Sequence, residues 1–268
     1  MDVLRNAFRT DFGRRTLELL AFSAMLTMLV IWWSWPLVPR IESGMFGIPG
    51  DSTGSIYDLW QASHYGFSLL PGSRNQLLGY PTGIASGGPL LLPGLLLYIP
   101  GVLLSLIFNE IVAYNILILV AVVGTGLASL VFFREIVASR AVAWGCSLAF
   151  TMLPYHQLSV LQWYGQGQLA GIPLSALCCL RFQEGPTSKR LGVLLGSVVL
   201  GFLTNAYVGL LTAVLALGAI ALSVIDHRRQ VVGAIRKLSL GQISRVLLAG
   251  LMAGGFILVL VSAAKRSV

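Results

Sequence analysis

Charged residues are scarce in this chain. They make up 10% of its 268 residues, whereas soluble domains carry about a quarter. Hydrophobic residues make up 56%, and the mean hydropathy is +0.82. So little charge cannot cover a water-facing surface, and apolar runs long enough to cross a bilayer recur along the whole length. We therefore expect a single all-α, polytopic membrane domain over residues 1–268, with no separate soluble domain.

Cysteine and the common enzyme motifs are also sparse. Cys146, Cys178 and Cys179 are the three cysteines, and their spacing matches neither a disulfide framework nor a zinc site. The chain has no Walker loop, H-E-x-x-H, G-x-S-x-G or dinucleotide-binding fingerprint. The sequence therefore predicts no metal site and names no cofactor.

The net charge of +8 does not indicate nucleic acid. The basic residues cluster at the ends of apolar runs, and no basic stripe with interleaved aromatic residues is present. Helix orientation in a bilayer explains such clusters, because cytoplasmic loops are enriched in Lys and Arg. We expect the lipid bilayer, and no nucleic acid, as a partner.

Eight apolar segments are candidates for membrane helices: 17–38, 88–108, 111–133, 141–158, 163–180, 191–206, 207–225 and 246–263. If 88–108 crossed the bilayer, the later basic segments would lie on the opposite side from the N-terminus. Pro89, Pro93 and Pro100 interrupt that segment, which favours a bent or interfacial element instead. We therefore predict about seven transmembrane helices.

With 88–108 kept on the outer side, the basic segments all fall on one side. These segments are 1–16, 134–140, 181–190 and 226–245. Fourteen of the 18 Lys and Arg residues then face the cytoplasm, as the positive-inside rule requires. We expect a cytoplasmic N-terminus and a basic cytoplasmic loop over 226–245.

The segment 39–110 is predicted to be a large first outer loop with interfacial or re-entrant helices. Within it, Ser55–Leu70 has amphipathic helical spacing and is predicted to lie along the membrane surface. Its apolar face is predicted to carry Ile56, Leu59, Trp60, Ser63, Phe67 and Leu70, and its polar face Asp58, Gln61 and Tyr65.

The same loop holds the acidic residues with the best case for chemistry. Asp51, in Pro-Gly-Asp-Ser-Thr-Gly, could act as a general base at the membrane surface, or it could cap a turn. Asp58, seven residues on, could face the same cavity or simply face water. His156 lies in a polar and aromatic stretch that could bind a hydroxylated or phosphorylated ligand, although an aromatic belt would also explain the stretch.

An ordered set of short motifs resembles the bacterial GT-C glycosyltransferases over roughly residues 15–225. The set consists of Gly50-Asp51, Tyr80-Pro81-Thr82-Gly83, Pro89-Leu90-Leu91, Val112-Ala113-Tyr114-Asn115, Phe132-Phe133-Arg134-Glu135, Ser139-Arg140-Ala141, Leu153-Pro154-Tyr155 and Thr204-Asn205-Ala206-Tyr207. Members of that superfamily move a sugar from a polyprenyl-phosphate donor to an acceptor on the outer face of the membrane. In them, an acidic residue of the first outer loop is the usual base.

The resemblance implies roles for particular residues. It makes Asp51 the catalytic base, with Asp58 as the second candidate, and Arg74 the cation that meets the donor phosphate. Tyr80 and His156 are the remaining substrate-binding candidates. It further implies a polyprenyl-phosphate sugar donor and a location in the bacterial cytoplasmic (inner) membrane.

Two alternatives to an enzyme remain at this point. Family members are usually longer, so the chain could be a non-catalytic scaffold or accessory subunit that keeps a partial transferase-like fold. A transporter is less well supported, because the sequence shows neither an inverted repeat nor midplane charges. For an enzyme or a scaffold alike, we expect another membrane subunit or a homo-oligomer as partner, with Gly250 and Gly254 on a helix face available for it. Gly192 and Gly196 have the same spacing, but such pairs are common in membrane helices.

Overall fold

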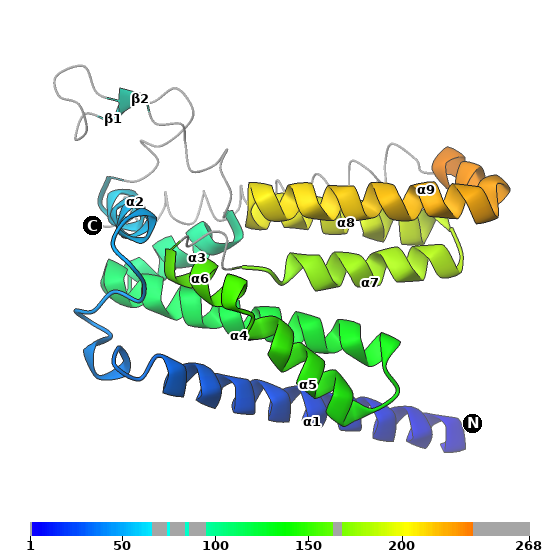
Figure 1. The fold of residues 1–268 in the computed structure, drawn as a ribbon, viewed down its shortest axis with the longest axis horizontal. Coiled ribbons are helices and arrows are strands. Elements are labelled where there is room, and N and C mark those ends of the chain that lie inside the picture. The colour runs from blue at the N-terminus through cyan, green and yellow to red at the C-terminus, as the bar shows by residue number, and fades with distance from the viewer. Residues whose placement is uncertain (1, 66–73, 76–83, 86–94, 163–167, 238–268) are drawn as a thin grey trace.

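The computed structural model shows a layered bundle of helices (Figure 1). It describes residues 2–65, 74–75, 84–85, 95–162 and 168–237. The longer elements are α1 (Asp2–Trp33), α4 (Glu110–Ile136), α7 (Gly171–Glu184), α8 (Ser188–Thr204) and α9 (Ala206–Lys237). The shorter ones are η1 (Val38–Arg40), α2 (Asp51–Tyr65), α3 (Leu95–Ser105), α5 (Arg140–Thr151) and α6 (Pro154–Gln162), with a two-residue antiparallel pair, β1 (Arg74–Asn75) and β2 (Ile84–Ala85).

Three helices in the described part of the chain are long and apolar enough to cross a membrane. They are Gly13–Trp33 within α1, α4 and α9. The prediction of about seven spans is not confirmed. The predicted spans 141–158, 163–180 and 191–206 correspond to shorter helices: α5 and α6 with 12 and 9 residues, α7 with 14, and α8 with 17. The predicted span 246–263 lies outside the described residues.

The segment 88–108 contains a helix too short to cross a bilayer. α3 has 11 residues, roughly half of the ~20 that a span needs, and Pro100 lies inside it. α3 packs on α2 and α4, and all three come together at one end of the bundle (Figure 1). We call the end formed by the 41–50 loop, α2, α3 and α6 the loop end.

The opposite end gathers arginines from five helices, α1, α4, α5, α7 and α8, and we call it the arginine end (Arg14, Arg134, Arg140, Arg181 and Arg190). Ion pairs hold it together. Glu18 of α1 lies 3.2 Å from Arg134 and 3.8 Å from Arg140, and Glu135 of α4 lies 2.6 Å from Arg181 of α7. The basic segments 134–140 and 181–190 therefore lie at the same end as the start of the α1 span, as the charge pattern predicts.

Side-chain caps and breaks determine where several helices begin. Asn109 caps α4, Ser139 caps α5 and Thr187 caps α8, each by accepting a hydrogen bond from a backbone N–H of the first turn. Asn205 separates α8 from α9, and its Oδ1 accepts from the Tyr207 N–H at 2.7 Å. This break lies at the boundary predicted between 191–206 and 207–225.

Two hydrophobic clusters form the interior. The first cluster contains residues of every helix from α1 through α6, among them Phe22, Leu26, Leu59, Val102 and Tyr114. The second contains residues of α7, α8 and α9, among them Phe182, Leu191, Leu194, Ala216 and Val231. α9 continues to Lys237, so the described part of the predicted 226–245 loop, residues 226–237, is helical. Non-helical backbone angles at His227 put a kink in this helix.

Candidate functional site

The loop that leads to Asp51 is held in place by one buried side chain of α4. Asn115 is fully buried, and its Oδ1 accepts a hydrogen bond from the Phe46 N–H at 2.9 Å. Its Nδ2 donates to the carbonyls of Ile41 at 3.0 Å and Gly44 at 2.8 Å. One amide thus satisfies three backbone groups, which fixes the path of the loop as it leaves α1.

A second attachment joins this loop to the end of α6. The Leu161 carbonyl accepts hydrogen bonds from the Ile48 N–H at 2.8 Å and from Ser52 Oγ at 3.4 Å. Gly47 makes this approach possible. Its φ is +128°, and a Cβ there would lie 2.6 Å from the Leu161 oxygen.

α2 begins at Asp51, directly after the attached loop, and Asp58 lies seven residues further on. Seven residues are close to two helical turns, so positions 51 and 58 share one face of α2 about 10 Å apart. From the sequence, the two carboxylates could face one cavity, or Asp58 could face water. The Asp51 side chain lies outside the part that the structure describes, so the shared cavity stays a prediction.

Asp58 is exposed, but the surrounding protein still removes enough water to raise the pKa of its carboxyl. Tyr98 of α3 lies beside it and donates to the Asp58 backbone carbonyl at 3.4 Å. Burial, and secondly the negative charge of Asp58, raise the pKa of Tyr98. A carboxyl that gives up its proton less readily is also a better base once ionised.

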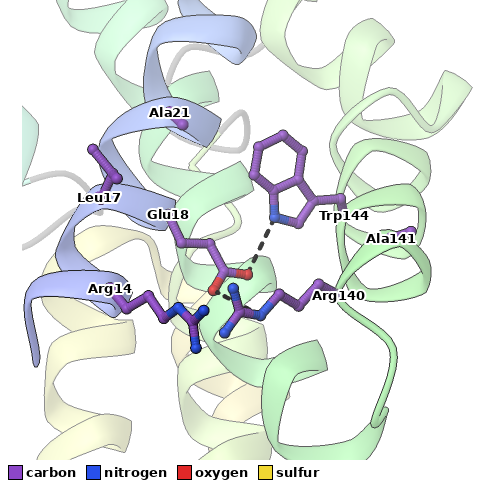
Figure 2. Close-up of a pocket in the computed structure, with 7 residues that line it drawn as sticks. All are labelled: Arg14, Leu17, Glu18, Ala21, Arg140, Ala141 and Trp144. Atoms are coloured by element: carbon purple, nitrogen blue, oxygen red, sulfur yellow. Dashed lines mark hydrogen bonds and ion pairs between the residues drawn. The ribbon is translucent and has the colours of Figure 1, made fainter. Parts of the chain in front are cut away.

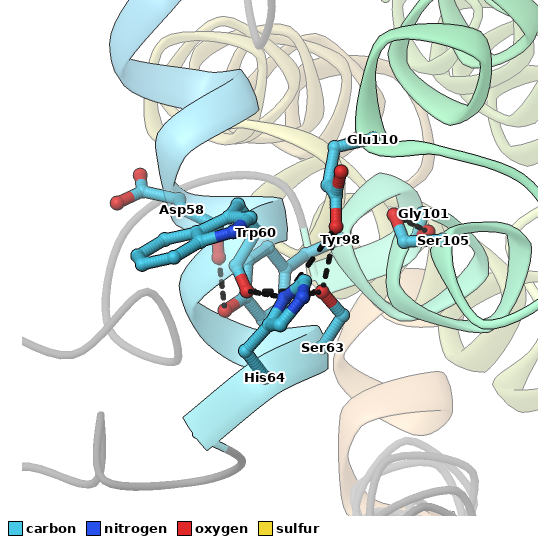
Figure 3. A network of polar contacts seen from close by, with 8 residues as sticks. All are labelled: Asp58, Trp60, Ser63, His64, Tyr98, Gly101, Ser105 and Glu110. Atoms are coloured by element: carbon cyan, nitrogen blue, oxygen red, sulfur yellow. Dashed lines mark hydrogen bonds and ion pairs between the residues drawn. The ribbon is translucent and has the colours of Figure 1, made fainter.

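A second polar group connects α2 to the start of α4 (Figure 3). Ser63 Oγ lies 3.1 Å from Glu110 Oε1, and His64 Nδ1 lies 3.5 Å from the same oxygen. His64 Nδ1 also lies 2.9 Å from the Trp60 carbonyl, which can only accept, so we assign a proton to Nδ1. Figure 3 shows the Asp58 carboxylate pointing away from this group.

The predicted polar face of α2 is wrong at Gln61. The structure buries Gln61 to 2% exposure, together with Leu59 at 1% and Ser52 at 0%. α2 packs against α3, α4 and α6, so neighbours cover it on more than the one apolar face that a surface helix would bury. Tertiary packing, rather than a membrane surface, decides which of these side chains meet water.

The structure places His156 in the interior, where it is 1% exposed. Its Nδ1 lies 2.6 Å from the carbonyl of Thr151, the last residue of α5, so it bridges the break between α5 and α6. Burial of this kind suits a structural role better than direct contact with a ligand.

The two remaining predicted residues lie in the long connection between α2 and α3. Arg74 is in β1, where its backbone is paired with Ala85 of β2. Tyr80 lies outside the described residues. The structure therefore places Asp51 and Asp58 on one helix, and the side chains of Asp51 and Arg74 lie outside the described part of the chain.

Sequence reasoning missed the roles of Asn115 and of Glu110 with His64. Asn115 was noticed only as part of a motif, although a lone amide inside a 27-residue apolar helix is itself a signal of a buried hydrogen-bond clamp. Glu110 and His64 are 46 residues apart, and no spacing rule could pair them. Among the described residues, no group of three or more His, Cys, Asp or Glu side chains is placed to hold a metal ion.

Chemically, the loop end offers two carboxyl-bearing residues on α2, a helix whose start is attached through the preceding loop to α4 and α6. Proton transfer at a membrane surface is the reaction type that such groups serve best. We found no match to this chain among protein-family models, curated proteins or solved structures.

Proposed function

We propose that the protein is a membrane glycosyltransferase that uses a polyprenyl-phosphate sugar donor at the loop end of the bundle, with Asp51 as the base. One observation carries the proposal: the loop ahead of Asp51 is attached to both α4 and α6, so the backbone at Asp51 is held in a defined position. Preorganisation of this kind is what a catalytic group requires.

The position of the loop end supports a lipid-linked substrate. α1 and α4, the helices on either side of this region in the chain, are both apolar enough to cross a bilayer. The short helices α2 and α3 lie between them in sequence and pack against α4. A donor with its prenyl chain in the bilayer would reach these helices sideways, with its phosphate at the surface.

The proposed reaction is a direct displacement. The Asp51 carboxylate takes the proton of the acceptor hydroxyl as the hydroxyl oxygen attacks the anomeric carbon. The bond from that carbon to the phosphate oxygen breaks, and polyprenyl phosphate leaves with the electron pair. Asp58, on the same face of α2 and two turns further along, is the alternative base. Arg74 is the proposed cation for the leaving phosphate.

The test is transfer activity in vesicles that contain the full chain and a set of polyprenyl-phosphate sugars. Asp51→Asn keeps the size of the side chain and removes the base, so we expect a loss of at least about 100-fold in turnover. Glu42→Gln is the matched control, because it removes an exposed carboxylate from the same loop. Unchanged turnover in Asp51→Asn would rule out this role for Asp51.

The alternative of a non-catalytic scaffold is an outcome of the same experiment. A folded protein that transfers no sugar from any donor would favour it.

We further propose a location in the bacterial inner membrane, with a second copy or another membrane subunit as partner. Mass measurement of the detergent-solubilised protein would detect that partner. A monomer that transfers sugar unaided would contradict the proposed partner.

A further inference from the structure

The arginine end contains a pocket of about 440 Å³ between α1 and α5 (Figure 2). Arg14, Glu18 and Arg140 supply its charged groups, and its remaining wall is formed by Leu17, Ala21, Ala141 and Trp144. Figure 2 shows the Arg14 and Arg140 side chains extending toward Glu18 from opposite helices. The pocket is therefore basic at one side and apolar at the other.

The single carboxylate in the pocket does not neutralise the arginines. Glu18 Oε1 lies 3.2 Å from Arg134 Nε and 3.3 Å from the Trp144 indole N–H, and Glu18 Oε2 lies 3.8 Å from Arg140 Nε. With Arg14 included, three positive charges surround one negative charge. Glu135, which follows Arg134 in the chain, is already paired with Arg181 at 2.6 Å. Counted over the described side chains, two positive charges are left for an anion.

The backbone adds to this attraction. α5 begins at Arg140, so the first N–H groups of a 12-residue helix face the same region and carry the positive end of its dipole. Ser139 accepts from the Val142 N–H at 3.5 Å, and helix geometry leaves the preceding N–H groups without a partner inside the helix. Arginine side chains and a helix start together suit a phosphate group.

The surroundings of the pocket favour a lipid over a soluble anion. The candidate span of α1 begins at Gly13, so Arg14 and Glu18 lie in its first turns. Leu17 is 67% exposed and Leu20 is 62% exposed on α1, and Val142 is 48% exposed on α5. An acyl chain can lie along these apolar side chains while the headgroup phosphate meets the arginines.

We propose that the pocket formed by Arg14, Arg140, Leu17 and Trp144 binds the phosphate headgroup of an anionic phospholipid. The bound lipid would bridge α1 and α5 at the end of the bundle that the charge pattern predicts to be cytoplasmic. This site is separate from the loop end, and it does not depend on the proposed transferase activity.

Native mass spectrometry of the full chain in detergent tests the site with phosphatidylglycerol, and with phosphatidylcholine of the same acyl chains for comparison. We expect phosphatidylglycerol to bind more tightly. Arg14→Gln should weaken that binding about tenfold, the loss expected for one charge-assisted hydrogen bond. Arg14 is the best position to change, since it forms no ion pair with another side chain that the structure describes.

Two further variants separate a built site from general charge. Arg229→Gln removes an exposed arginine of α9 that does not line the pocket, and should leave binding within about twofold. Ala141→Trp keeps every charge but fills the pocket, and should weaken binding as strongly as Arg14→Gln. Equal losses in Arg14→Gln and Arg229→Gln would overturn the proposal, as would unchanged binding in Ala141→Trp.

Glycerol phosphate distinguishes the two sources of a phosphate. If the acyl chains contribute as proposed, glycerol phosphate at equal concentration should fail to displace phosphatidylglycerol. Displacement by glycerol phosphate would overturn the lipid assignment and identify a site for soluble phosphate-bearing anions.

Discussion

Asp58 is an exposed residue whose charge the fold still disfavours. Burial raises the pKa of this carboxyl above 3.8, its ordinary value. Folding therefore favours the neutral form. Ionisation of Asp58 therefore lowers the free energy of unfolding. This loss is absent below the ordinary pKa, and it is fully present once the pH exceeds the raised pKa.

Asp58→Asn should therefore stabilise the protein at neutral pH. Because Asp58 is exposed and solvent screens its charge, the gain should stay below about 1 kcal/mol, and it should vanish as the pH falls toward 4. Thermal unfolding in detergent at several pH values measures the difference from the unchanged protein. A gain that is equally large at acidic pH would show that the carboxylate charge is not its cause.

Asn115 is the side chain on which the path of the 41–46 loop depends most. Asn115→Ala would leave the buried Phe46 N–H and the partly buried carbonyls of Ile41 and Gly44 without their partner. Losses of this kind cost about 1–3 kcal/mol for each group, so we expect a destabilisation of at least about 2 kcal/mol. If Asp51 is the base, transfer activity should fall as well.

Val120→Ala is the control for this change, because Val120 lies on the same helix and is 58% exposed. We expect its midpoint of thermal unfolding to stay close to that of the unchanged protein. Equal midpoints for Asn115→Ala and Val120→Ala would contradict the clamp.

Among the elements, the connection from α1 to α2 contains two glycines with positive φ, Gly47 and Gly50, and Gly47 also lies against the Leu161 carbonyl. Gly47→Ala would force a side chain into a backbone angle of φ +128° and against the Leu161 carbonyl. We expect a loss of about 1–3 kcal/mol. The attachment of the loop to α6 should also loosen, which hydrogen exchange at the Ile48 N–H would reveal as faster exchange.

Gly54→Ala is the control for Gly47→Ala, and it should change stability in the opposite direction. Gly54 lies inside α2, and a Cβ there would meet no atom within 4 Å. Alanine favours a helix over glycine, so we expect a gain of about 0.5–1 kcal/mol. Destabilisation by Gly54→Ala would mean that α2 packs more closely than the structure shows.

For the molecule as a whole, the separation of the loop end from the arginine end is open to direct test. Cysteines placed at Ser43 and Ser188 lie at opposite ends of the bundle. In a background that lacks Cys146, Cys178 and Cys179, a membrane-impermeant thiol reagent should label position 43 from outside intact cells. Position 188 should require disrupted membranes, because the charge pattern predicts that it faces the cytoplasm.

Labelling of both positions from the same side would contradict this arrangement of the two ends. Reversed labelling would keep the arrangement and invert the orientation of the protein in the membrane.

The amino-acid sequence by itself determined the membrane character and the distribution of charge. Both depend on composition and order, since an apolar run must leave water and basic segments must stay at helix ends. For the same reason the sequence located α4, the break at Asn205 and the Pro-interrupted segment that contains α3. These features are local, and no distant residue is needed to predict them.

The tertiary structure alone decided which side chains meet. Gly192, chosen by spacing, has open space beside it, whereas Gly47 and Gly101 are among the glycines whose neighbours lie too close for a Cβ. Gln61 is buried although its helix position predicted water. Glu18 meets arginines more than 110 positions away in the chain. Close contacts and buried polar partners depend on how helices cross, and helical periodicity describes only one helix at a time.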